Sequence, residues 1–143
     1  MAKVAAAGKI EGIVFGRVDF SGSLGLGRAG IETDDVTNRV VETAKVASNY
    51  KLDLVVGGAV SSDALPQLKR INKEYLTRFE TRKVVFAANS LDGEQIDKAL
   101  LNAVHFELLW LLNKRSYYAQ ITAEDNKRIE MLESRWNILN GSN

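Results

Sequence analysis

The sequence contains no cysteine, one proline (Pro66) and one histidine (His105). The lack of cysteine excludes disulfides, thiolate metal sites and thiol nucleophiles, and it is typical of a cytoplasmic protein. One histidine cannot pair with an absent cysteine in a triad. Because His105 lies mid-helix between Val104 and Phe106, we interpret it as structural. These absences leave the charged residues at the strand ends as candidates for chemistry.

An excess of charge of one sign and long hydrophobic runs are also lacking. The net charge is +1, so there is no bulk electrostatic attraction to nucleic acid or to an anionic membrane. The most apolar run is LLWLL at residues 108–112, and the wider segment is interrupted by His105 and Glu107. A membrane span requires ~20 apolar residues, and the first residues lack the apolar core of a signal peptide. We therefore predict no binding to nucleic acid or membrane.

The residues that are present predict a globular α/β protein. A chain of 143 residues with 45% hydrophobic residues suggests a single domain, residues 1–143, with a real core. Short apolar blocks predict strands, the first of them buried on both faces, and segments of helical periodicity alternate with them. The strands are predicted over residues 10–16, 52–58 and 78–89, and the helices over residues 34–50, 61–77, 90–120 and 122–141.

Three local signals support these boundaries. Pro66 is compatible with its helix only in the first turn, and Ser90 is a candidate cap for the long helix. Thr122 and Asp125 resemble a capping box at the start of a separate final helix. Residues 16–33 are predicted to form a loop. The alternation of strands and helices predicts parallel strands joined by right-handed crossovers.

Two features indicate that the chain completes itself by association. A sheet of three parallel strands leaves two exposed edges. The apolar residues between Ile96 and Leu112 cover more than one face of the long helix, which predicts burial nearly all round. A body of this size can hardly bury such a helix alone, so we expect an oligomer.

Two motifs have alternative interpretations. GLGRAG at residues 25–30 matches the glycine pattern of dinucleotide-binding folds, but it lies too far from the strand end and the next helix, which favours a flexible loop. RINKEYLTRFETRK at residues 70–83 mixes five basic residues with two glutamates, which favours a solvated, ion-paired surface over a nucleic-acid site.

The carboxyl ends of the predicted strands are the best candidates for a site, because ligands bind there in parallel α/β folds. Asp19 lies shortly after the first strand, and Gly57 and Gly58 end the second. A carboxylate at this position is a plausible ligand for a hard cation such as Mg²⁺. Asp19 is equally compatible with capping of loop amides or with an ion pair to Arg17.

The stretch IEGIVFGRVDFSGSLGL at residues 10–26 resembles the strand-six signature of the HpcH/HpaI aldolase and citrate lyase β-subunit superfamily. That signature is a hydrophobic strand, a glycine, two residues, Asp-Leu-Ser and then Ser-Leu-Gly, and Phe20 replaces the usual leucine here. VVGGAVSSDALPQLKRI and FETRKVVF resemble the seventh and eighth strands. The resemblance implies a partial (β/α)₈ TIM barrel, strands six to eight, over residues 10–90, with a C-terminal helical extension over residues 91–143.

The resemblance also implies a metal-dependent carbon–carbon lyase acting on an oxo-acid or carboxylate substrate. In this family Mg²⁺ or Mn²⁺ is held by a strand-five glutamate and the strand-six aspartate, which Asp19 matches. The implied substrate-binding residues are Gly16, Val18 and Ser21 near the carboxylate, with Gly57, Gly58 and Arg82 at the rim. The catalytic residues stay unassigned.

The strand-five glutamate and the family's upstream catalytic residues have no counterpart in this sequence, because a full member runs to ~250 residues. The chain therefore resembles the C-terminal half of an aldolase. A second copy or a complementary N-terminal-half polypeptide would be expected to complete it. The alternative is a non-catalytic oligomerisation or scaffold module that keeps the fold remnant and the oligomerising helices without turnover.

Overall fold

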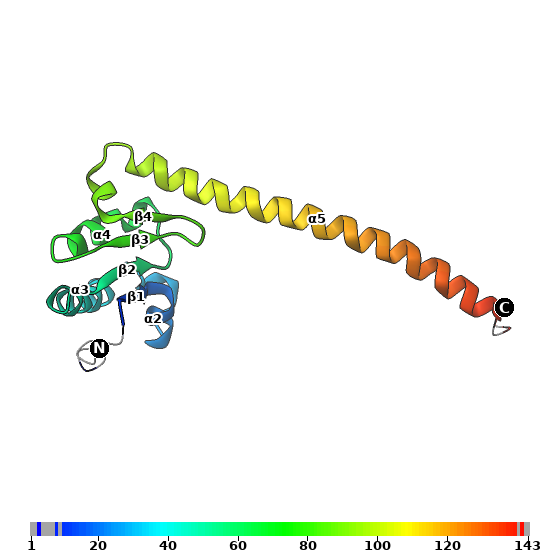
Figure 1. Cartoon of the computed structure of the whole chain (residues 1–143), viewed down its shortest axis with the longest axis horizontal. Coiled ribbons are helices and arrows are strands. Elements are labelled where there is room, and N and C mark those ends of the chain that lie inside the picture. Colours follow the sequence, from blue (N-terminus) through cyan, green and yellow to red (C-terminus); the bar gives the residue numbers. More distant parts are fainter. Residues whose placement is uncertain (1–2, 4–7, 9, 140, 142–143) are drawn as a thin grey trace. The chain divides into compact units, whose positions relative to one another are not determined.

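The computed structural model describes residues 3, 8, 10–139 and 141 and contains two compact units, residues 1–106 and 107–143 (Figure 1). The first is an α/β unit, and the second is formed mainly by the greater part of one long helix, α5. In chain order the helices and strands are β1 (Gly12–Gly16), α2 (Arg17–Ser23), α3 (Asp34–Asn49), β2 (Asp53–Gly57), α4 (Leu65–Asn72), β3 (Arg78–Glu80), β4 (Val85–Ala87) and α5 (Ile96–Leu139). Short 3₁₀ turns span Arg28–Gly30, Ser62–Ala64 and Ala88–Asp92.

The four strands form one sheet in the order β1-β2-β3-β4. β1 pairs with β2 and β2 pairs with β3 in parallel, and the register places Gly16 beside Gly57 and Gly57 beside Glu80. β3 and β4 pair in the antiparallel direction. The carboxyl ends of β1, β2 and β3 therefore meet at one edge of the sheet, which we call the carboxyl edge.

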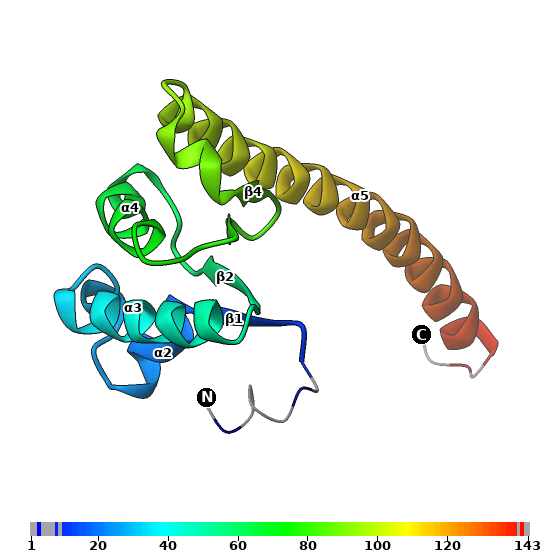
Figure 2. The same cartoon turned by 60° about the vertical axis from the view of Figure 1, so that its left-hand side comes forward.

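The core lies between one face of this sheet and the neighbouring helices α3 and α4 (Figure 2). Val40 and Ala44 of α3 and Leu68 and Ile71 of α4 have no exposed surface. Along β1 burial alternates, so the expectation that this strand is buried on both faces is wrong. Val14 on the opposite face is 66% exposed. An alternating pattern is typical of a sheet that is covered on one side only.

The predicted partial (β/α)₈ barrel is wrong. Residues 78–89, expected to be a third parallel strand, form the hairpin β3–β4 instead, so the sheet ends in an antiparallel strand and contains no barrel strands six to eight. The turn is closed by Thr81, whose backbone N–H donates to the Val84 carbonyl at 2.9 Å and whose hydroxyl accepts from the Val84 N–H at 3.1 Å. Because this turn reverses the chain, no crossover follows β3.

Several predicted helix boundaries also change. The segment expected to be a loop contains the short helix α2. Pro66 lies in the first turn of α4, as expected, where its missing N–H has no intrahelical partner to lose. Ser90 does not cap α5, since it lies in the 3₁₀ turn before the helix and its hydroxyl donates to the Ala87 carbonyl at 2.7 Å.

The two C-terminal helices that the sequence predicts form one continuous helix, α5. Thr122 does not cap a new helix, because its hydroxyl donates to the carbonyl of Tyr118, one turn earlier, at 2.9 Å. This bond satisfies the threonine within an unbroken helix. The sequence AQITA at residues 119–123 contains neither glycine nor proline to end the helix there.

Candidate functional site

Two surfaces of the chain are candidates for function: the carboxyl edge of the sheet and the long helix α5. The carboxyl edge holds most of the residues that the sequence predicts to form a site. Gly16 ends β1 and Gly57 ends β2 beside it. Asp19 is exposed in the first turn of α2, and its carboxylate lies back over the end of β1, with Oδ2 3.0 Å from the position that a Cβ on Gly16 would occupy.

The structure brings Gly58 and the first residues of α2 into close contact. A Cβ on Gly58 would lie 2.8 Å from the backbone nitrogen of Val18 and 3.0 Å from that of Arg17. This approach leaves no room for a side chain at residue 58. Of the residues predicted to bind substrate, Gly16 and Val18 near the carboxylate and Gly58 at the rim are thus brought together, and Gly57 lies beside Gly16.

The other two predicted residues take different positions. Ser21 is fully buried, and its hydroxyl donates to the Gly27 carbonyl at 2.6 Å, so it serves the loop that follows α2. Arg82 is exposed in the turn between β3 and β4. Local structure determines both positions. Ser21 is held by the loop after α2, and Arg82 lies in the turn of the β3–β4 hairpin.

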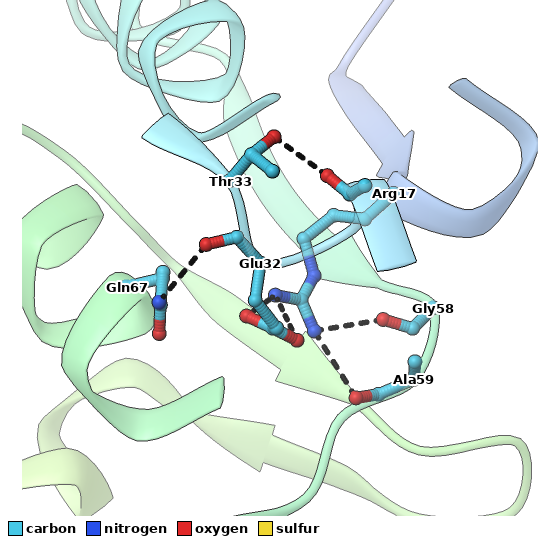
Figure 3. A network of polar contacts seen from close by, with 7 residues as sticks. Arg17, Glu32, Thr33, Gly58, Ala59 and Gln67 are labelled. Atoms are coloured by element: carbon cyan, nitrogen blue, oxygen red, sulfur yellow. Dashed lines mark hydrogen bonds and ion pairs between the residues drawn. The ribbon is translucent and has the colours of Figure 1, made fainter. Parts of the chain in front are cut away.

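Arg17, which sequence reasoning leaves without a role, is the most completely buried charged side chain of the described residues, at 1% exposure. Its Nη1 donates to both carboxylate oxygens of Glu32, at 3.1 and 2.9 Å, and its Nη2 donates to the carbonyls of Gly58 and Ala59 at 2.8 and 3.2 Å (Figure 3). Asp19 is therefore not the ion-pair partner of Arg17. Burial lowers the pKa of Arg17, and the charge of Glu32 and its hydrogen bond oppose that shift.

This cluster joins three segments that are distant in the sequence. Arg17 begins α2, Gly58 and Ala59 follow β2, and Glu32 precedes α3. Gln67 of α4 adds a fourth segment by donating to the Glu32 carbonyl at 3.3 Å. The four hydrogen bonds of Nη1 and Nη2 are all to the chain itself, whereas the buried Nε has no hydrogen-bond partner among the described residues. An arginine bonded in this way is typical of structural support. No spacing rule in the sequence connects Arg17 with Glu32.

The carboxyl edge offers only part of a metal site. The described part of the chain holds no group of three or more His, Cys, Asp or Glu side chains that could bind a metal ion. Asp19 supplies one carboxylate, and Glu80, at the end of β3, has its carboxyl beside Gly57. Mg²⁺ is commonly held by one or two carboxylates together with waters and substrate. Asp19 and Glu80 could therefore supply part of the ligand set of such an ion.

Helix α5 is the second candidate. Beyond the first two turns, where Ile96, Leu100 and Ala103 are buried, it has no buried residue among those described. Large apolar side chains are exposed along the unit 107–143: Leu108, Leu109, Trp110, Leu111, Leu112, Tyr117, Tyr118, Ile121, Ile129, Met131, Leu132, Trp136, Ile138 and Leu139. So many exposed apolar side chains on one helix indicate an interaction surface.

Comparison with protein-family models, with curated proteins and with solved structures gives no significant match. The resemblance to the aldolase superfamily therefore stays a hypothesis. Among the residues that the structure describes, no helix has an apolar stretch of the length that crossing a membrane requires.

Proposed function

We propose that this chain is a non-catalytic assembly module that associates with other polypeptides through helix α5. The observation that supports this proposal is the apolar surface of residues 107–139, which has no cover within the described residues. The α/β unit has its own core, to which α5 contributes only Ile96 and Leu100. The rest of the helix is therefore not needed to complete that core.

Burial of the exposed apolar side chains of α5 favours association. Burying a leucine-sized side chain that would otherwise be exposed gains about 1.5–3 kcal/mol. Helix α5 offers many such side chains, so association through it is favourable even after the cost of immobilising two partners. We place the module in the cytoplasm, which the lack of cysteine favours.

The first prediction is that the full chain self-associates through α5. Sedimentation velocity should show a mass above that of the monomer at ~100 μM, decreasing on dilution, as expected for an equilibrium between chains. The variant Leu111→Asp/Leu132→Asp places two charges in the apolar surface and should sediment as a monomer at that concentration.

Val14→Asp is the matched control, because Val14 is an apolar residue exposed on the open face of the sheet. It should associate like the wild type. A wild-type chain that is monomeric at every concentration, or association that Val14→Asp alone abolishes, would contradict the proposed role of α5.

A metal-dependent carbon–carbon lyase acting on an oxo-acid is the second candidate function. It is favoured by the position of Asp19 and Glu80 at the carboxyl edge, where parallel strands bind ligands. Asp19 would hold Mg²⁺ or Mn²⁺, and the ion would supply charge stabilisation for an enolate. The amides of Val18 and Asp19 lie at the same edge. This candidate ranks second because the barrel fold that the resemblance implies is absent.

Isothermal titration tests this second candidate. If it holds, Mg²⁺ together with pyruvate or oxaloacetate should bind the wild type, and Asp19→Ala should abolish the heat by removing a ligand carboxylate. Asp63→Ala, which removes a carboxylate in the turn before α4, is the control and should bind as the wild type does. Absence of heat at about millimolar ligand, where even weak specific sites respond, would exclude the lyase.

A further inference from the structure

The exposed surface of α5 contains a regular stripe of residues, and its pattern bears on the register and direction in which two such helices would pair. Within residues 107–139, one face repeats at alternating spacings of three and four residues, the pattern of a coiled-coil seam. We call this face the α5 stripe: Leu108, Leu111, Arg115, Tyr118, Thr122, Asp125, Ile129 and Leu132. All eight residues are exposed, the apolar members by about half.

The stripe is apolar at both ends and polar in the middle. Arg115, Thr122 and Asp125 occupy the centre, with Tyr118 between them, and leucine or isoleucine occupies the flanks. Arg115 and Asp125 carry opposite charges, and no ion pair within the described part of the chain engages either of them. A charge placed in a seam sets the register and orientation of a pair, because it is costly without a partner.

The order of these residues distinguishes the two possible orientations. In a parallel pair each stripe position faces the same position of the second copy, so Arg115 meets Arg115 and Asp125 meets Asp125. In an antiparallel pair centred on residue 120, each stripe position faces the position of the other copy that lies equally far from residue 120 on its other side. Arg115 then faces Asp125, and the like-charge contacts disappear.

The same reversal matches the rest of the stripe. Leu108 faces Leu132, Leu111 faces Ile129, and Tyr118 faces Thr122. The spacing continues beyond the stripe in both directions, and it brings Trp136 opposite Val104 and Leu139 opposite Leu101. Every layer therefore pairs apolar with apolar, opposite charges, or tyrosine with threonine.

The reversal also sets the contacts of residues beside the seam. Reversal brings Glu107 next to Arg135 of the other copy, which is a contact between opposite charges. It also brings Ile121 next to Ile121 of the other copy, which is an apolar contact. It also brings Lys114 near Arg128, which is unfavourable. The Lys114 ammonium lies 5.2 Å from the centre of the Trp110 ring, a cation–π contact that directs it along its own helix.

We propose that two copies of this chain pair through the α5 stripe as an antiparallel coiled coil, with the two-fold axis at residue 120 and two Arg115–Asp125 ion pairs between the copies. The inference rests on the proposed assembly function and adds the partner, the register and the direction of pairing. A symmetric pair closes on itself, because each copy presents the same surface to the other.

A charge exchange tests the pairing. Two layers of the proposed pair bring residue 115 of one copy opposite residue 125 of the other. In both layers Arg115→Asp places two aspartates opposite each other, and Asp125→Arg places two arginines there. Either variant should raise the dimer dissociation constant by about tenfold or more, since a desolvated like-charge pair costs over a kcal/mol. The double variant Arg115→Asp/Asp125→Arg restores opposite charges and should return to within about threefold of the wild type. Equal helicity by circular dichroism confirms that the variants fold.

The direction is measured separately. The chain has no cysteine, so Ser134→Cys provides a single exposed site for a spin label. In the antiparallel pair the two labels lie 28 residues apart along the axis, about 40 Å at 1.5 Å per residue. In a parallel pair they lie side by side, about 20 Å apart, given the spacing of packed helices.

The outcomes separate this inference from the assembly function on which it rests. A dimer with a short label distance, or one in which the double variant does not recover, overturns the antiparallel pairing but leaves association through α5 intact. A chain that stays monomeric overturns both. A dimer with the long distance and with recovery by charge exchange supports both.

Discussion

Replacing Arg17 by alanine is expected to lower the free energy of unfolding of the α/β unit by about 3–5 kcal/mol, because each buried polar group that loses its partner costs about 1–3 kcal/mol. The substitution removes four hydrogen bonds. It leaves the carbonyls of Gly58 and Ala59 without their donor and the carboxylate of Glu32 without its counter-charge. The cavity left by the guanidinium adds a further cost.

The measurement has to report on the α/β unit, because both tryptophans, Trp110 and Trp136, lie in the helical unit. Hydrogen exchange of the β2 amides in increasing denaturant gives the free energy of opening of the sheet. Arg39→Ala is the matched control. It removes an arginine that is paired with Glu42 at 3.0 Å, with both side chains 63% exposed, and exposed pairs contribute at most about 1 kcal/mol. Equal effects of the two substitutions would show that the Arg17 cluster is not a structural support.

The strands and helices that the sequence predicts correctly are those with a strong period. Residues 34–49 place Val36, Val40 and Ala44 on one face, and this pattern fixes α3 almost to the residue. The block LDLVVGG at residues 52–58 is apolar and ends in glycines, and it forms β2. In both segments local preference and tertiary packing favour the same structure.

The errors arise where a local signal and the tertiary structure disagree. The run RKVVFAA at residues 82–88 is consistent with one long strand, and the turn at Thr81–Val84 depends on hydrogen bonds that no composition rule shows. Thr122 and Asp125 match a capping box, yet the helix continues through them because nothing in residues 119–123 ends it. The barrel expectation came from the resemblance and took the hairpin segment as a third parallel strand.

The candidate sites also differ in how far the sequence predicts them. The apolar excess of the long helix is visible in the sequence, and the described residues of α5 beyond residue 103 are not buried. The burial by association that the sequence predicts stays a prediction. The Arg17–Glu32 cluster is not visible, because its members are 15 residues apart and are brought together only when the strand ends and the start of α3 assemble. Long-range polar contacts of this kind require the fold.

Replacing Gly58 by alanine is expected to destabilise the α/β unit by about 2–5 kcal/mol, combining about 1–2 kcal/mol for a left-handed backbone with about 1–3 kcal/mol for overpacking. Gly58 has φ of +89°. An added Cβ would lie 2.8 Å from the Val18 nitrogen, and this neighbour is backbone, which cannot rotate away. The start of α2 would have to move away from the end of β2, which would also strain the bond from Arg17 to the Gly58 carbonyl.

Gly25→Ala separates the two causes. Gly25 has φ of +71° but nothing within 4 Å of an added Cβ, so this variant carries the backbone strain without the clash and should lose only about 1 kcal/mol. Hydrogen exchange of β2 compares both variants with the wild type on the same scale. If Gly58→Ala loses no more than Gly25→Ala, the close approach of residue 58 to α2 does not hold. A larger loss for Gly58→Ala shows that the carboxyl edge is closed by backbone contact, with the Arg17 guanidinium bonding to the carbonyls beside it.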